Sequence, residues 1–281
     1  MELSQVEATV AYKLPRKEFR LMPIGDVQFG AEGCDVDRFK RHMERGLQAG
    51  AYFLGMGDYV DVASPSNRQR IRTAALYDSV SNALEEKAQE HVEKFLRLVR
   101  GSEGKWLGLL SGHHYWDFSD GTTSDTRLAA ALKAPFLGTC AGIRLLFQEA
   151  KHQNSCVIWA HHGRGSGAKQ SAPLNKLETV TPGFDADIYL IAHHHKIAAA
   201  KYGQLYMTHT TPPALKQREK VIAGTGGFLR GYLQGSKQGG IPAGTYVEQG
   251  MMMPVALGGI TLKIKPVRSS EADHIEIFVE Q

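Results

Sequence analysis

Cysteine is scarce in this 281-residue sequence, and its pattern excludes two classes of small stabilised protein. The three cysteines, Cys34, Cys140 and Cys156, are odd in number, and none of them stands in a CxxC pair. Neither a disulfide framework nor a structural zinc site made of thiolates fits such scattered positions. We therefore expect a protein of a reducing compartment, the cytoplasm.

Long apolar runs and a strong excess of one charge are also missing. No run approaches the ~18 apolar residues of a membrane span, and residues 1–10 carry two glutamates where a signal peptide has an apolar core. Lysine and arginine together number 33, against 29 for aspartate and glutamate. This balance permits a nucleotide or nucleic-acid partner without arguing for one. We expect no membrane partner, and nothing in the sequence indicates an oligomeric state.

The composition that is present is that of a globular α/β protein. Hydrophobic residues make up 42% and charged residues 22%, and the length suffices for a core that needs no crosslinks. We expect residues 1–281 to form a single domain. Within it, a glycine-rich region at about 224–259 is expected to contribute loops and edge strands.

Five apolar runs have the character of buried strands, and each delivers acids or histidines at its C-terminal end. They lie at 19–26, 51–58, 105–111, 155–160 and 186–192. Helical periodicity at 35–49, 73–100 and 126–133 separates several of them. Strands interleaved with helices predict an α/β sheet, in which ligands bind beyond the carboxyl ends of the strands.

Two further patterns give specific expectations. Residues 73–100 predict one long helix or two shorter ones whose buried stripe is Leu76, Val80, Leu84, Ala88, Val92, Phe95 and Val99. Alternating residues at 259–265 and 274–279 predict antiparallel strands that close the second sheet.

The residues at the strand ends have the chemistry of a two-metal site. Two divalent ions about 3.5–4 Å apart need a bridging carboxylate and nitrogen or oxygen ligands on each side. Asp26 and Gln28, two residues apart on one loop, can turn toward one ion, and Asp58 is a candidate bridge. His113 and the later histidines complete the set.

The order of these blocks resembles the calcineurin-like metallophosphoesterase family, whose pattern is DxH, GDxxD, GNH(D/E), a histidine-bearing loop and GHxH. The matching segments are Asp26-Val-Gln28, Gly57-Asp-Tyr-Val-Asp61, Gly112-His-His-Tyr115, Ala160-His-His-Gly163 and Ala192-His-His-His195. The resemblance covers roughly residues 20–200. It implies a four-layer α/β/β/α metallophosphatase sandwich with two mixed β-sheets and both metals at the sheet edge.

The resemblance also implies two sets of metal ligands. The first ion would be held by Asp26, Gln28, Asp58 and His195. The second would be held by Asp58 as the bridge, His113, His193 and either His161 or His162. Of the last two, His162 is preferred because it precedes Gly163, as in the family's His-Gly pattern.

His114 matches the family histidine that lies over the metals, so Asp58 and His114 are the catalytic candidates. Tyr115 stands where the family has the acid that orients this histidine. Asp117 is the expected substitute for that acid, and Asp61 is expected to hold its own loop.

These assignments imply hydrolysis of a phosphodiester or pyrophosphate bond by a hydroxide that bridges two divalent ions. Gln28 replaces the usual histidine with a harder oxygen ligand, which favours manganese; magnesium, zinc, nickel, cobalt and iron are alternatives. The DxQ form also occurs in manganese-dependent ADP-ribose/CDP-alcohol diphosphatases of this superfamily. The alternative function is a non-catalytic metal-binding or scaffold module that retains the fold.

The substrate is expected to be a nucleotide derivative or a nucleic acid. Arg164 and Arg230 are candidates for contacting its phosphate. So are two short basic clusters, one of Arg68, Arg70 and Arg72 and one of Lys216, Arg218 and Lys220. A nucleotide fits the Gln28 variant, whereas a nuclease function fits the arginine clusters.

Overall fold

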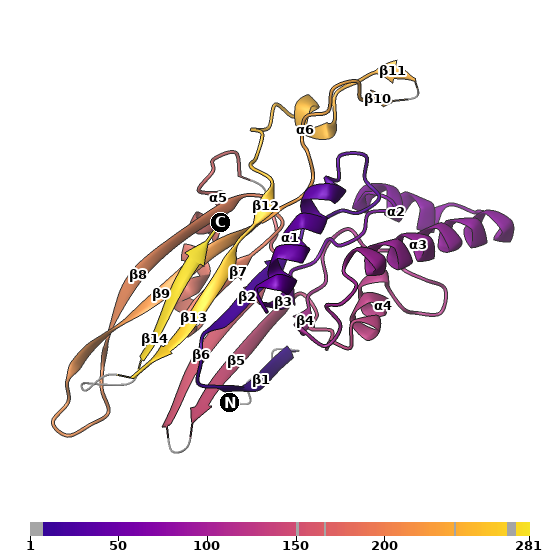
Figure 1. The fold of residues 1–281 in the computed structure, drawn as a ribbon. Helices are drawn as coiled ribbons and strands as arrows, with labels where there is room; N and C mark the ends of the chain where they lie inside the picture. Colours follow the sequence, from indigo (N-terminus) through magenta and orange to yellow (C-terminus); the bar gives the residue numbers. More distant parts are fainter. Residues whose placement is uncertain (1–7, 150–151, 166, 239, 269–273) are drawn as a thin grey trace.

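Two mixed β-sheets with helices outside them make up the protein in the computed structural model (Figure 1), which describes residues 8–149, 152–165, 167–238, 240–268 and 274–281. The smaller sheet has the order β14 (His274–Glu280), β13 (Thr261–Val267), β2 (Phe19–Ile24), β3 (Tyr52–Gly55) and β4 (Trp106–Leu109). Strands β2, β3 and β4 are parallel, and β13 pairs antiparallel with β2 and β14.

The larger sheet has seven strands. Its order is β1 (Ala8–Pro15), β5 (Cys140–Glu149), β6 (His152–His161), β7 (Ile188–Ile191), β9 (Leu215–Gly227) and β12 (Gly258–Gly259), with β8 (Ile197–Met207) also paired to β9. Strands β6, β7 and β9 are parallel to one another. A separate pair, β10 (Lys237–Gln238) and β11 (Ile241–Pro242), lies beyond the sandwich.

The two sheets share one core. Leu21 and Leu54 of the smaller sheet and Ile143 and Leu190 of the larger sheet belong to the same buried cluster. Met22, next to Leu21, belongs instead to a second cluster on the helix-covered face. Because successive strand residues point to opposite faces, strands buried on both faces read as continuous apolar runs, as found at 19–26 and 51–58.

Helices cover the outer face of each sheet. On the smaller sheet lie α1 (Val36–Gln48), α3 (Asp78–Leu98) and α4 (Ser124–Ala131), whose buried side chains include Phe39 and Phe95, with ring centroids 5.6 Å apart. On the larger sheet lies α5 (Ala172–Val180), which buries Leu177 against Trp159 and Tyr189. The expected four-layer α/β/β/α sandwich with two mixed sheets is confirmed.

The expectation for residues 73–100 needs a correction. The chain forms α2 (Pro65–Thr73) and then α3, and only the later part of the expected stripe is buried. Leu76 and Val80 are 38% and 44% exposed, whereas Val92 and Phe95 are buried. Figure 1 shows one end of α3 projecting beyond the sheets, so that end has no layer against which to bury its stripe.

Pairing between distant parts of the chain adds two features to the expected sheets. The expected antiparallel pairing of the last two strands is confirmed, and β13 also pairs with β2 and so extends the sheet of β2–β4. The long β8–β9 hairpin was not expected, because the exposed face of β8 gives it no apolar run. The remaining elements are a short 3₁₀ turn (Thr181–Gly183) and α6 (Tyr246–Gln249). None of the helices in the described ranges is long and apolar enough to cross a membrane.

Helix α1 buries a histidine that makes stability depend on pH. His42 is 2% exposed, lies against Phe228, and has Arg45 Nη2 3.4 Å from its Nδ1. Burial, followed by the charge of Arg45, lowers the pKa of His42 to about 4. The unfolded chain therefore binds a proton between about pH 6.5 and pH 4 that the folded chain does not bind, and the free energy of unfolding falls as the pH drops through this window.

We expect His42→Leu to remove up to about 3 kcal/mol of this pH dependence. The measurement is urea unfolding of the parent and the variant at pH 7 and at pH 4.5, with the difference between the two proteins isolating His42 from other titrating groups. Equal slopes of stability against pH in the two proteins would contradict the assignment.

Candidate metal centre

The loops that follow β2, β3, β4, β6 and β7 meet at one end of the sandwich. The backbone amides of Val27 and Gln28 donate to the Asp58 carbonyl, at 3.0 and 2.9 Å. The amides of His113 and His114 donate to Asp58 Oδ1, at 2.5 and 2.8 Å. Loops of both sheets thus converge on Asp58, as the carboxyl ends of parallel strands in an α/β fold do.

The backbone at this end is unusual. Seven non-glycine residues have positive φ in the described part of the chain, and five of them are the proposed ligands Asp26, Gln28, Asp58, His193 and His195. Each such conformation costs on the order of 1–3 kcal/mol and persists where the surrounding structure enforces it. The concentration of these conformations at the strand ends makes this region the candidate functional site.

Four side chains form a compact ligand set. One ligand atom from each of Asp58, His113, His162 and His193 lies within 4.8 Å of the others. The Nδ1 atom of His113 is 3.1 Å from Nε2 of His162 and 3.2 Å from Nδ1 of His193. A carboxylate and three imidazoles are suitable ligands for a divalent transition metal, so this cluster can bind a metal ion.

A hydrogen bond fixes the orientation of the His162 imidazole ring and the nitrogen that carries its proton. Its Nδ1 lies 2.7 Å from the Met56 carbonyl oxygen, which can only accept, so Nδ1 carries a proton and Nε2 faces the cluster. Burial opposes protonation of this ring, but the hydrogen bond and charge of Asp58 raise the pKa of His162 to about 9. Burial, His162 and His113 lower the pKa of His193 to about 4, so His193 offers a neutral nitrogen.

Asp58 stays ionised despite being buried. Burial by itself raises its pKa, but the hydrogen bond and charge of His162, followed by His114, hold the pKa of Asp58 below its usual value. The cluster therefore presents one negative charge among converging imidazoles. A divalent cation would replace the single shared proton and satisfy all of these ligands.

A second group of proposed ligands lies beside this cluster. Asp26 is fully buried, and neither oxygen of its carboxylate accepts a hydrogen bond. Burial raises the pKa of Asp26, which the charges of His195 and His162 oppose. A cation next to this carboxylate would supply the missing interaction, so the residues here fit a metal ion.

His114 lies at the mouth of the site and is oriented by Asp61. Its Nδ1 is 3.0 Å from Asp61 Oδ2, and although burial opposes protonation, this contact raises the pKa of His114. The expectation that Asp117 would substitute for the orienting acid is wrong. Asp117 instead binds Arg72 at 3.2 Å and Arg68 at 3.7 Å.

Arg68 stabilises the loop of residues 112–115, which contains His114. Its Nη1 donates to the carbonyl of His113 at 2.8 Å and to that of Tyr115, and its guanidinium lies over the Tyr115 ring. Asp125, fully buried, accepts the Gly112 amide at 3.2 Å. Both residues hold the 112–115 loop; the sequence offered no signal for Asp125, because it lies within a helix outside the five blocks.

The other candidates lie farther from the ligand atoms. His161 accepts the Gly163 amide at 2.7 Å and stacks on Trp159, away from the cluster. Arg164 is exposed, and its charge contributes to lowering the pKa of His113 after burial, His162 and His114. Arg230 binds Asp35, the capping residue of α1, at 2.8 Å.

Two glycines allow the ligand loops to approach one another. A Cβ atom at Gly112 would lie 2.0 Å from Asp58 Oδ1, and one at Gly57 would lie 2.6 Å from His162 Nδ1. Gly57 also has a φ of +93°, which other residues rarely adopt.

We expect Gly112→Ala to lower metal affinity about 10–100-fold, because the methyl group displaces the Asp58 carboxylate from its position. Isothermal titration of metal-stripped protein with Mn²⁺ measures the loss. Gly183→Ala is the control, since a Cβ at Gly183 meets no atom within 4 Å and the backbone there does not have positive φ. Unchanged affinity in Gly112→Ala would contradict this placement of Asp58.

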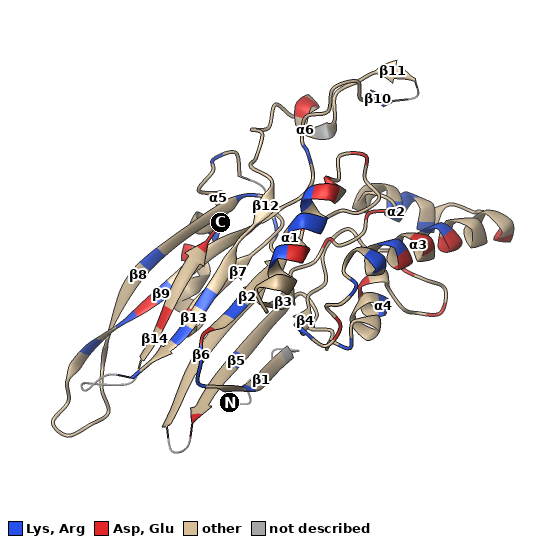
Figure 2. Ribbon diagram, in the orientation of Figure 1, with Lys and Arg blue, Asp and Glu red and all other residues tan. Residues whose placement is uncertain are grey.

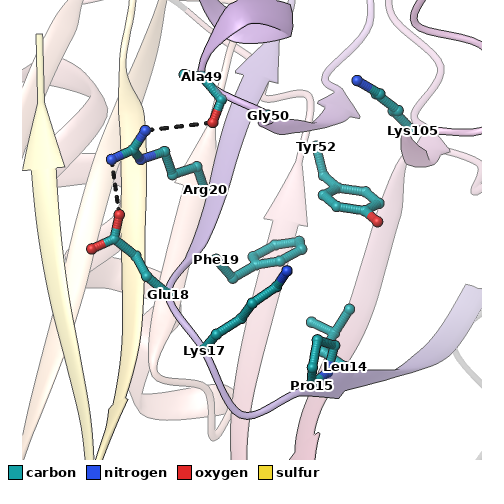
Figure 3. A pocket seen from close by; sticks show the side chains of 10 residues that line it. All are labelled: Leu14, Pro15, Lys17, Glu18, Phe19, Arg20, Ala49, Gly50, Tyr52 and Lys105. Carbon is teal, nitrogen blue, oxygen red and sulfur yellow. Dashed lines mark hydrogen bonds and ion pairs between the residues drawn. The ribbon is translucent and has the colours of Figure 1, made fainter.

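One cavity lies away from this chemistry. It has a volume of about 540 Å³ at the start of β2, and Figure 3 shows its lining. The lining residues are Leu14, Pro15, Lys17, Glu18, Phe19, Arg20, Ala49, Gly50, Tyr52 and Lys105. A second cavity of about 370 Å³ reaches Gln28, Asp58, His114, His193 and His195. Of these two cavities, only the second is lined by proposed metal ligands.

Comparison with known proteins adds little to this geometry. No protein-family model matches the chain, and no curated protein matches it. Among solved structures the chain is similar to vacuolar protein sorting 29 from Cryptosporidium parvum, with 12% identity over 94% of this chain and 98% of that chain and a TM-score of 0.34. At that TM-score the similarity supports no functional assignment, and the assignment of the fold rests on the sheets and helices themselves.

Proposed function

We propose that this protein is a metal-dependent phosphoesterase with a dinuclear site. The observation that carries the proposal is the convergence of Asp58, His113, His162 and His193 within 4.8 Å, with Asp26 and its unpartnered carboxylate alongside. The order of the five motifs resembles that of calcineurin-like phosphoesterases and supports the same reading.

The proposed ligands divide into two sets that share Asp58. His113, His162 and His193 hold one ion with it, and Asp26, Gln28 and His195 hold the other. Gln28 contributes an amide oxygen, which favours manganese over softer metals. Two such ions supply a water of lowered pKa as the nucleophile and neutralise charge on the phosphate oxygens.

The chain's own residues orient and protonate the substrate. His114 faces the same cavity as the ligands and lies 3.0 Å from Asp61. With its pKa raised by that contact, His114 holds a proton at Nε2 that it can donate to the departing oxygen. Asp61 keeps the imidazole in the orientation that points Nε2 into the cavity.

The substrate class that fits this chemistry is a phosphodiester or a pyrophosphate. Arg164, whose side chain is exposed and whose charge acts on His113, is the favoured contact for a phosphate oxygen, whereas Arg230 must leave Asp35 to make such a contact. A nucleotide derivative and a nucleic acid both contain the required bond.

The test is hydrolysis of bis-p-nitrophenyl phosphate and p-nitrophenyl phosphate by metal-stripped protein after addition of Mn²⁺, Mg²⁺, Zn²⁺, Ni²⁺ or Co²⁺. We expect activity that requires the metal, is highest with Mn²⁺ and prefers the diester. Metal binding by calorimetry without hydrolysis under any of these conditions would overturn the proposal and identify a non-catalytic metal-binding or scaffold module.

A further inference from the structure

The cavity at the metal centre is lined by two chemically different groups of residues. The polar lining consists of Gln28, Asp58, His114, His193, His194 and His195. The apolar lining consists of Leu229, Val247, Met251, Met252, Met253 and Val255. A ligand whose phosphate lies at the polar lining therefore has methionine and valine side chains in the same cavity for the group attached to that phosphate.

Apart from Leu229, the apolar lining belongs to one segment, residues 231–257, which we call the methionine arm. Figure 1 shows its elements α6, β10 and β11 standing beyond the end of the sandwich. Hydrogen bonds within the arm hold its wall in place: Tyr232 Oη donates to the Met252 carbonyl at 2.8 Å, and the Met252 amide donates to the Val247 carbonyl at 3.0 Å. The Leu233 amide donates to Glu248 Oε1 at 2.9 Å.

The three methionines are unusually open for apolar side chains. Met251 is 92% exposed, Met253 is 53% exposed and Met252 is 45% exposed. Met251 also has a positive φ, so it shares the unusual backbone of the ligand residues. Contiguous exposed apolar side chains mark ligand or partner sites, and methionine adapts to varied apolar and aromatic groups. The same cavity is lined by the methionines and by proposed metal ligands, so a ligand bound at the metal centre is the occupant that these methionines would contact.

The low charge of the methionine arm argues against a polyanionic occupant beside the apolar lining. Between Gly231 and Leu257 the sequence has one lysine, Lys237, and one glutamate, Glu248. Figure 2 shows this region as almost entirely uncharged. Lys196, which lines the cavity, is engaged by the carbonyls of three residues, Gly167, Ala168 and Lys169. A nucleic acid needs cationic side chains to neutralise its successive phosphates, and the arm provides no such surface.

We propose that the substrate is a small phosphate ester with an uncharged apolar organic group, and that Met251, Met252 and Met253 bind this group. The proposal rests on the phosphoesterase function for the location of the phosphate. It narrows the substrate class from any nucleotide or nucleic acid to small esters whose attached group is aromatic or aliphatic. Methionine sulfur also favours an aromatic ring through direct contact.

The test compares an aryl with an alkyl ligand on the full-length, Mn²⁺-loaded protein. Calorimetry measures binding of phenylphosphonate and methylphosphonate, and kinetics measure kcat/KM for phenyl and methyl p-nitrophenyl phosphate. We expect the phenyl compound to be favoured at least about tenfold in both measurements, as for hydrophobic pockets in general. The variant is the triple substitution Met251→Ser, Met252→Ser and Met253→Ser. The matched control is Met207→Ser, which changes a methionine that is 65% exposed on β8.

The triple variant is expected to lose the phenyl preference, to within about threefold, while methyl binding and the Met207→Ser control stay unchanged. Equal binding of the two phosphonates by the parent protein, no binding of either, or a preference retained by the triple variant would each overturn the proposal. So would displacement of phenylphosphonate by single-stranded DNA at a lower phosphate concentration than by the small esters. A phenyl preference in binding without any hydrolysis would refute the phosphoesterase function and retain only the binding of an apolar group by the three methionines. Hydrolysis without the preference would retain the phosphoesterase function and refute this binding.

Discussion

Replacement of Asp58 by asparagine is expected to abolish high-affinity binding of metal at the centre and to reduce diester hydrolysis roughly 1,000-fold or more. Asp58 is the residue on which both proposed ligand sets depend, and its charge holds the His162 proton in the metal-free protein. Asparagine keeps an oxygen that can accept the amides of His113 and His114, so the loop keeps these hydrogen bonds. Calorimetry with Mn²⁺ and the rate of bis-p-nitrophenyl phosphate hydrolysis measure the two losses.

The folded state of Asp58→Asn is the control for this result. The variant should keep the circular dichroism spectrum of the parent, because the substitution changes a charge and not a volume. Asp35→Asn changes an aspartate that binds Arg230 and Arg38, and it should retain hydrolysis. Full activity in Asp58→Asn would refute its place as the shared ligand.

The second large effect is expected from His114 and the acid that orients it. His114→Ala should lower kcat about 100–10,000-fold while metal affinity remains, because a general acid contributes that much and His114 lies outside the ligand cluster. Asp61→Asn should lower kcat about 10–100-fold by releasing the imidazole from its orientation. Both values come from steady-state kinetics at saturating Mn²⁺ with a diester whose leaving group is an alkyl alcohol, because such a group needs a proton to depart.

Asp117→Asn is the matched comparison, since it removes the same charge from the acid nearer in sequence to His114. It breaks only ion pairs with Arg68 and Arg72 on a partly exposed side chain and should leave kcat within roughly twofold. A larger loss in Asp117→Asn than in Asp61→Asn would reverse the assignment of the orienting acid. A leaving group of low pKa, such as p-nitrophenol, should lessen the effect of His114→Ala relative to an alkyl leaving group.

The layers of the fold were predictable because a strand that is buried on both faces has a continuously apolar sequence. Runs such as 19–26 and 51–58 are continuously apolar, and the helix-forming stretches between them imply outer layers. The β8–β9 hairpin and the pairing of β13 with β2 were not predictable. The side chains of β8 are largely exposed, and pairing between strands more than 200 residues apart leaves no local pattern.

The sequence by itself determined which residue types stand at the strand ends, and in what order. A strand buried on both faces has room only for apolar side chains, so the first polar residue after it lies in the following loop. Only the tertiary structure decided which of two neighbouring candidate residues contributes its side chain to the site. His162 joins the cluster and His161 does not, since adjacent residues at the end of a strand point to opposite sides. Asp61 rather than Asp117 meets His114, and the methionine arm reaches the metal centre from residues 231–257, because packing brings together loops that are distant along the chain.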